Sequence, residues 1–428
     1  ASCCLNPITN PLICYTLSYE YHFSLFTFHL AMLKIQADYV FPIHTAPIPN
    51  GIVVLDDAGY IVQVARAGAY NPDEVRQLSG ILCPGFVNTH CHIELSHLKG
   101  VIPEGTGLIN FLQPIGSLRE TYDPDFITEQ ITLAEQEMWQ NGIVAVGDIA
   151  NTTHSLQQKS NTNLLYHTFV EIFGLNPART SASMQSGINL CNLFRAQKQH
   201  RCSLAPHAPY SASASLLSSI ALYNNEQGGI TSIHNQECTA EDELFRYGTG
   251  AFVAFYQNLG LGNIADFFTP PGTSSLRYVL NSAANAQKML LIHNTYTSRA
   301  DITEALTRFA GSIYWCFCPN ANLYIENQLP NFDAFLNQPD WLTIGTDSLT
   351  SNRQLCVLSE LKTIAQHAPH IPLQQLLTWA TLNGANALGF EHQLGSLQAG
   401  KRPGLVWINN INLSTLQLTP QSRATKVA

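Results

Sequence analysis

The chain has 428 residues, of which 45% are hydrophobic, and its formal net charge at pH 7 is −9. This composition supports a large buried core, and an acidic chain does not offer the basic surface that nucleic-acid binding requires. The 11 cysteines include no C-x-x-C pair, which is typical of buried thiols in a reduced, cytoplasmic protein.

The first 31 residues differ from the rest of the chain because they contain no lysine or arginine. They therefore lack the basic segment of a secretory signal. Glu20, His22 and His29 interrupt the apolar stretch 12–31, so this stretch does not satisfy the requirement for a membrane-spanning helix. We expect residues 1–31 to be an extension outside the fold, and an extra hairpin packed on the small domain is the alternative.

Residues 32–80 alternate short apolar runs with turns. The runs 52–55 and 60–64 flank Asp56-Asp57-Ala58-Gly59, a pattern typical of a β-hairpin. Near the other end, residues 404–408 again have the pattern of a strand. We expect segments 32–80 and 391–428 to form one small, discontinuous β-sandwich domain.

Residues 81–390 alternate short apolar strands with segments of helical periodicity, such as 125–140 and 373–388. This alternation predicts parallel βα units and an α/β fold. The strands are expected at 81–88, 143–149, 164–172, 202–206, 230–234, 289–293, 312–317 and 341–346. Eight such units over this length predict a (β/α)8 TIM barrel.

Polar side chains occur at the ends of these strands, where the active site of such a barrel lies. His90 and His92 are two residues apart on an extended strand, so both imidazoles point to one face and can bind one metal ion. The later strand ends supply Asp148, Glu171, His207, His234, Glu237, His293 and Asp347. Asp148 and Glu171 have three possible roles: they hold the barrel loops, orient the metal ligands or contact the substrate.

The segment Pro84-Gly85-Phe86-Val87-Asn88-Thr89-His90-Cys91-His92 resembles the first metal-binding strand of the amidohydrolase superfamily. His90, His92, His234 and Asp347 match the single-metal pattern of its deaminase and chlorohydrolase branch. The resemblance implies one divalent metal ion, with zinc favoured, although iron(II) would accept the same ligands. Members with two metals usually carry a carboxylated lysine where this chain has Leu204-Ala205-Pro206-His207.

The resemblance also implies the catalytic roles. A bound metal lowers the pKa of water to about 7, so that water can attack an amidine-like ring carbon. Glu237 would supply a proton to the ring nitrogen, Asp347 would take the proton of the attacking water, and His293 would polarise the water or the leaving group. The expected substrate contacts are Glu94, Ser96, His207, Asn322 and Arg353, with capping of the following helix as the alternative for Arg353.

We therefore expect a cytoplasmic deaminase that releases ammonia from an adenine nucleoside-like compound, such as aminofutalosine or S-adenosylhomocysteine. Glu94-Leu95-Ser96 is closer to the members that deaminate aminofutalosine. Hydrolysis of a triazine- or guanine-type ring, with chloride or another leaving group, is the alternative within the fold. A catalytically silent, ligand-binding barrel is the alternative of another class. The expected partner is a small molecule, not nucleic acid or membrane, and the family's frequent dimers imply a homodimer.

Overall fold

The computed structural model describes residues 32–197 and 200–428. The prediction that residues 1–31 are an extension lies outside the described residues. Among the helices that are described, none has both the length and the apolar character needed to cross a membrane.

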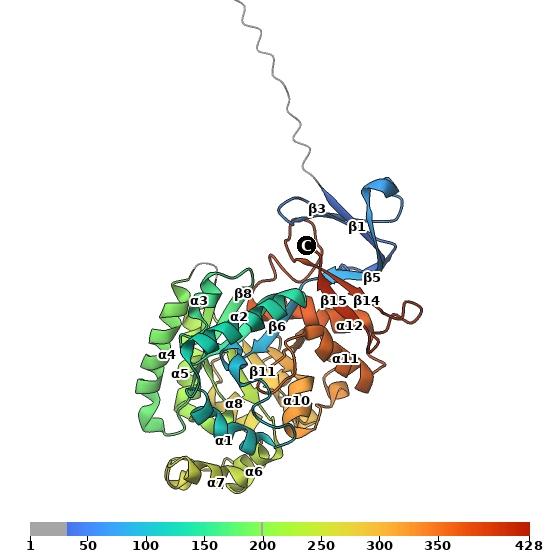
Figure 1. Cartoon of the computed structure of the whole chain (residues 1–428). Helices are drawn as coiled ribbons and strands as arrows, with labels where there is room; N and C mark the ends of the chain where they lie inside the picture. The colour runs from blue at the N-terminus through green and yellow to red at the C-terminus, as the bar shows by residue number, and fades with distance from the viewer. Residues whose placement is uncertain (1–31, 198–199) are drawn as a thin grey trace, which may run out of the picture. The chain divides into compact units, whose positions relative to one another are not determined.

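Strands from both ends of the described chain share one seven-stranded sheet (Figure 1). Its order is β15-β14-β5-β1-β3-β4, with β2 paired to β1. The predicted hairpin is confirmed, because β3 and β4 pair antiparallel. The C-terminal strand β14 pairs antiparallel with β5, so strands from both ends share one sheet. The division into one small, discontinuous β-sandwich domain stays a prediction. The strands are β1 (Leu33–Val40), β2 (Ile48–Pro49), β3 (Ile52–Leu55), β4 (Ile61–Ala65), β5 (Arg76–Pro84), β14 (Leu405–Asn409) and β15 (Arg423–Lys426).

Eight further strands form two four-stranded parallel sheets, in the orders β6-β7-β8-β9 and β10-β11-β12-β13. Hydrogen bonds link the ends of the two sheets: the His234 amide donates to the His207 carbonyl (3.0 Å), and the Asp347 amide donates to the His90 carbonyl (3.1 Å). The carboxyl end of β10 therefore lies beside that of β9, and the carboxyl end of β13 lies beside that of β6. The strands are β6 (Phe86–Cys91), β7 (Ile143–Ala150), β8 (Leu165–Ile172), β9 (Arg201–Pro206), β10 (Thr231–Asn235), β11 (Met289–His293), β12 (Ile313–Phe317) and β13 (Leu342–Ile344).

The first of the predicted parallel strands, 81–88, is wrong as a single strand, because the chain divides at Gly85. Residues before Gly85 belong to β5 and pair with β14, and residues after it begin β6. A Cβ atom at Gly85 would lie 2.3 Å from Val144 Cγ1 and 2.6 Å from the Pro403 carbonyl oxygen. Only glycine permits this close approach, so the chain passes from the seven-stranded sheet to the first parallel sheet at Gly85, whereas the prediction began the parallel strand at residue 81. The other predicted strands are confirmed to within about two residues at each end.

Helices follow most of the parallel strands. The predicted helix 125–140 is confirmed as α2, whose N-terminus is capped by Asp123 through a bond from the Asp125 amide. The predicted helix 373–388 is helical throughout but contains a π-helical turn at Trp379–Asn383 between α12 and α13. The helices are α1 (Leu108–Leu118), α2 (Pro124–Gln140), α3 (Leu156–Ser160), α4 (Thr180–Arg195), α5 (Ala214–Glu226), α6 (Thr239–Tyr247), α7 (Ala251–Asn258), α8 (Ser275–Ser282), α9 (Arg299–Arg308), α10 (Pro319–Glu326), α11 (Val357–His367), α12 (Leu373–Thr378) and α13 (Gly384–Leu388).

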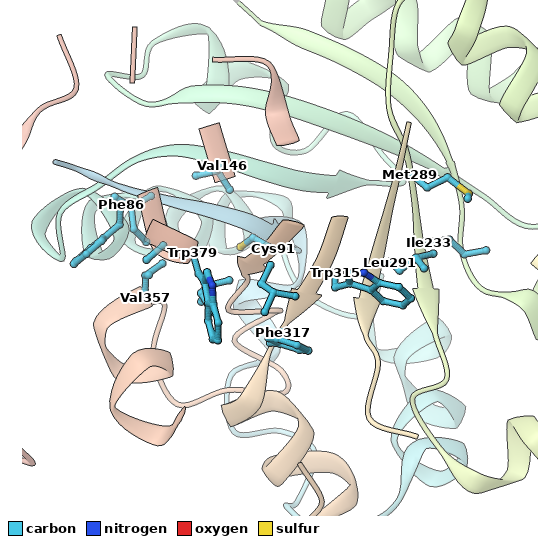
Figure 2. Close-up of a cluster of buried hydrophobic side chains, with 14 of the residues drawn as sticks. Phe86, Cys91, Val146, Ile233, Met289, Leu291, Trp315, Phe317, Val357 and Trp379 are labelled. Carbon is cyan, nitrogen blue, oxygen red and sulfur yellow. The ribbon is translucent and has the colours of Figure 1, made fainter. Parts of the chain in front are cut away.

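The parallel strands are buried on both faces, which explains their nearly continuous apolar sequences. On β11 and β12, Leu291, Trp315 and Phe317 join a large cluster that includes Val357 of α11 (Figure 2). The intervening residue Leu290 belongs instead to a second apolar cluster on the opposite face. Helix packing on one face and strand packing on the other thus fix which way the side chains at the strand ends point.

Candidate active site

Four side chains from distant parts of the chain bring their donor atoms together at the ends of β6, β10 and β13. The Nε2 atom of His92 lies 3.2 Å from that of His90 and 3.3 Å from that of His234. Asp347 Oδ1 lies 3.5 Å from His90 Nε2 and 3.4 Å from His92 Nε2. A tetrahedral ion with bonds of about 2.0–2.1 Å separates its ligand atoms by about 3.3–3.4 Å, so the spacing fits one such ion.

The protonation of these four groups also suits a cation. Burial lowers the pKa of His90, His92 and His234, which favours neutral imidazoles with a free lone pair. His234 Nδ1 lies 2.7 Å from the His207 carbonyl and donates to it, so its Nε2 faces the cluster unprotonated. Burial would raise the pKa of Asp347, but its neighbouring histidines hold it well below its usual range. Three neutral imidazoles and one carboxylate form a divalent-metal donor set.

Backbone strain marks the same strand ends. Gln236, His293 and Asp347 have φ angles of 46°, 72° and 57°, in the left-handed region that residues other than glycine rarely occupy. Such strain costs about 1–3 kcal/mol per residue and concentrates at functional sites. The chain therefore turns sharply at or shortly after the ends of β10, β11 and β13.

Glu237 and His293 form an acid–base pair next to the cluster. Glu237 Oε1 lies 3.6 Å from His293 Nε2. Burial, with the charge of Asp347 second, raises the pKa of Glu237 well above its usual range, which favours the protonated carboxyl group. Burial also lowers the pKa of His293, whose Nδ1 donates to Asn322 Oδ1 at 2.8 Å. The neutral His293 therefore presents the lone pair of Nε2 toward Glu237.

Two residues that the sequence reasoning missed hold this arrangement in place. Glu241, in the first turn of α6, accepts bonds from the amides of Gln236 (3.1 Å) and Glu237 (3.2 Å). Ser351 donates its hydroxyl hydrogen to Asp347 Oδ2 at 2.6 Å. The position of Glu241 four residues after Glu237 was a local signal for the first contact. The second depends on a loop whose path no sequence pattern predicted.

Asp148 orients the chain beside the cluster. Its Oδ1 accepts from the amide of Ile93, the residue after His92, at 2.8 Å. Its Oδ2 forms an ion pair of 2.6 Å with Lys159 Nζ, and both side chains are almost completely buried. These contacts correspond to the loop-holding alternative for Asp148. Lys159 was not anticipated, because a lone lysine in a helical segment ordinarily faces solvent.

Two of the expected substrate contacts lie at the cluster. The ring of His207 is 4.9 Å from that of His234, and its Nδ1 lies 2.8 Å from Ser211 Oγ. Asn322 contacts His293 and, through its amide nitrogen, donates to Thr295 Oγ1 at 2.9 Å. Both residues therefore border the site, and their roles toward substrate stay predictions.

The other three expected substrate contacts use their polar groups within the chain. Glu94 Oε2 accepts from the amides of Asn151 and Thr152, and Oε1 accepts from Ser155. The Ser96 hydroxyl donates to the Ile93 carbonyl at 2.7 Å. Arg353 is exposed and makes two bonds of 2.9 Å to Glu104, so it caps no helix through these groups. The structure thus does not bring Glu94, Ser96 and Arg353 into contact with the metal-binding cluster through any described hydrogen bond.

Glu171, at the end of β8, lies near Nδ1 of His234, whereas Nε2 of the same ring faces the cluster. Its Oε2 accepts from Asn151 Nδ2 at 3.0 Å. Its Oε1 is 3.7 Å from His234 Nδ1 and has no hydrogen-bond partner. Burial raises the pKa of Glu171 to about 7.

Comparison with known proteins places this site in a family. Residues 81–426 match the model of the amidohydrolase family. This match covers more than half of the chain, and the protein belongs to the amidohydrolase family.

Individual relatives share most of the chain at low identity. A 5-methylthioadenosine/S-adenosylhomocysteine deaminase of Teredinibacter turnerae is 26% identical over 79% of this chain and 73% of its own length. Helicobacter pylori aminofutalosine deaminase, solved with methylthio-coformycin, is 22% identical with a TM-score of 0.73, covering 90% of this chain and 93% of that one. An adenosine deaminase from Xanthomonas campestris with bound zinc is 24% identical with a TM-score of 0.67, covering 91% and 86%. These two structures show a common fold.

Proposed function

We propose that this protein is a metal-dependent hydrolytic deaminase that releases ammonia from an adenine nucleoside-like compound. The observation that carries the proposal is the buried Glu237 carboxyl, 3.6 Å from His293 and next to the cluster of His90, His92, His234 and Asp347; burial raises the pKa of this carboxyl, which favours its protonated form. Hydrolysis of an aromatic amidine requires a proton donor at the ring nitrogen in addition to a polarised water. The related proteins are named as deaminases of adenine-bearing compounds, which supports the same substrate class.

In this proposal His90, His92, His234 and Asp347 hold one divalent metal, of which zinc is the favoured candidate. When bound, this metal would supply Lewis acidity and lower the pKa of water to about 7. Zinc is supported by the donor set and by its presence in the related Xanthomonas campestris structure.

We also infer that the two parallel sheets close into one (β/α)8 barrel and that the seven-stranded sheet corresponds to the β-sandwich of the family.

The chain's own residues then divide the proton transfers. Glu237 donates its proton to the ring nitrogen of the substrate, which keeps negative charge from building up on the ring. The carboxylate of Asp347 accepts the proton of the attacking water, and Ser351 fixes the rotation of this carboxylate. His293, oriented by Asn322, accepts a hydrogen bond at Nε2 from the water or the leaving amine. Asp347 then passes its proton to the amine, which leaves as ammonia, and the remaining proton of the added hydroxyl group returns to Glu237 as the ring carbonyl forms.

The proposal is tested by measuring ammonia release from zinc-loaded protein with aminofutalosine, S-adenosylhomocysteine, methylthioadenosine, adenosine, guanine and aminotriazines. Glu237→Gln should retain the metal but lose about 10²- to 10⁴-fold in turnover, because the amide cannot donate an acidic proton. Glu243→Gln, at an exposed position of α6, is the matched control and should behave as the parent. Near-full activity in Glu237→Gln would contradict the proton-transfer role. Halide release from a chlorotriazine, with no ammonia from the other compounds, would move the reaction to the chlorohydrolase type.

A further inference from the structure

One oxygen of Glu171 lacks the hydrogen bond that a buried polar atom normally has. The side chain of Glu171 is only 3% exposed, and its Oε1 has no partner in the described residues. The nearest candidate donor, His234 Nδ1, is 3.7 Å away, beyond hydrogen-bond range, and already donates to the His207 carbonyl at 2.7 Å. Because leaving a buried acceptor unpaired is costly, Oε1 is placed to receive a donor from a ligand.

Phe173, two residues further along the chain, is an apolar side chain that is exposed. Its aromatic side chain is 49% exposed although it lies beside the site. The His207 ring lies between Phe173 and His234, with its centroid 4.7 Å from that of Phe173 and 4.9 Å from that of His234. An unpaired oxygen and an exposed ring on the same side of the cluster form a polar and an apolar contact for the part of the substrate that does not react.

The chemistry of the substrate class limits which donor can reach Glu171. This step rests on the proposed function. In an adenine nucleoside the exocyclic amine must lie at the metal-binding cluster, and the ring nitrogens of the base are acceptors. The remaining donors are the hydroxyl groups of the sugar. Glu171 Oε1 lies beside Nδ1 of His234 and not beside Nε2, which faces the cluster, so it is set back from the reacting group as a sugar contact would be.

We propose that Glu171 is a specificity-determining residue that accepts a hydrogen bond from one sugar hydroxyl of the substrate, while Phe173 packs against an apolar face of the same nucleoside. Asn151 holds Oε2 at 3.0 Å and thereby keeps Oε1 turned away from it. One free oxygen permits one strong contact, so a single hydroxyl group should account for the discrimination.

The test compares Glu171→Leu and Glu171→Gln with the parent protein on adenosine, 2′-deoxyadenosine and 3′-deoxyadenosine, or on the same series of whichever nucleoside is the better substrate. The parent should prefer the compound that carries the contacted hydroxyl by about 10- to 100-fold in kcat/KM. Glu171→Leu should abolish this preference mainly through KM, with little effect on the analogue that lacks that hydroxyl. Glu171→Gln should retain part of the preference, because its amide oxygen still accepts.

Phe173→Ala is the companion variant and should weaken binding of all three nucleosides alike, since an aromatic contact does not depend on the hydroxyl. Metal content and the thermal unfolding midpoint are measured on every sample. Equal losses by Glu171→Leu on all compounds together with lost metal would assign Glu171 to the support of His234 and overturn the inference. If Glu171→Leu fails to fold, the parent alone decides, because equal rates on the three nucleosides would also overturn it. A parent that deaminates no adenine compound would instead refute the proposed function itself.

Discussion

Replacing Lys159 by methionine should destabilise the protein by about 3–5 kcal/mol, the usual cost of removing one partner from a buried ion pair. Lys159 is 1% exposed and Asp148 is fully buried. The substitution leaves the Asp148 carboxylate with the bond from the Ile93 amide as its remaining stabilising contact. Burial raises the pKa of Asp148 and Lys159 opposes this rise, so the pKa should rise further in the variant. The variant should then lose more stability as the pH increases.

The double variant Asp148→Asn/Lys159→Met should be much more stable than Lys159→Met alone. The asparagine side chain keeps an oxygen for the Ile93 amide, and no uncompensated charge remains. The rings of Tyr166 and Phe194, 5.1 and 4.7 Å from Lys159 Nζ, offer an apolar surface to methionine. A double-mutant cycle with Asp148→Asn isolates the interaction energy of the pair.

The assay is the midpoint of thermal unfolding, followed by circular dichroism at about pH 6 and pH 8. With an unfolding entropy of about 2.1 cal/mol/K per residue, a chain of 428 residues has about 0.9 kcal/mol/K. A loss of 3–5 kcal/mol therefore corresponds to about 3–6 °C. A midpoint for Lys159→Met within 1 °C of the parent, or equal to that of the double variant, would refute the reasoning that the cation compensates a buried charge.

Three further outcomes can be measured on the same protein. Burial raises the pKa of Glu360 from 4.5 to about 8, so the folded chain keeps a proton that the unfolded chain loses, and this group's stabilisation declines as pH rises from about 4.5 to about 8. Glu360→Gln, which mimics the protonated carboxyl, should flatten that decline in the unfolding midpoint; unchanged slopes would argue against it. Removing metal with a chelator should abolish activity. Adding zinc back at a thousand times its Kd should restore activity and stabilise the parent by about 4 kcal/mol, whereas His92→Ala should show neither effect. Gly85→Ala should lower the midpoint through its clash with Val144, unlike Gly116→Ala in α1, where no atom lies within 4 Å and φ is not positive.

The sequence predicted the elements whose determinants are local. Parallel strands buried on both faces appear as continuous apolar runs, so their positions were found to within about two residues. The spacing of His90 and His92, and of His234 and Glu237, is likewise readable because each pair lies within one strand end. The strand at 81–88 failed because its break depends on Val144 and on the Pro403 carbonyl, and no pattern near Gly85 records those neighbours.

The sequence by itself therefore determined the kind of fold, the family and the residue types available at the strand ends. Only the tertiary structure decided how each of them is used. Glu94 and Glu171 both follow or end apolar strands, yet Glu94 has its oxygens filled by backbone amides and a hydroxyl, whereas Glu171 keeps one oxygen unpaired. Asp148 has a cationic partner because Lys159 is buried against it. The physical reason is that burial and hydrogen bonding depend on which segments pack together, and these lie far apart along the chain.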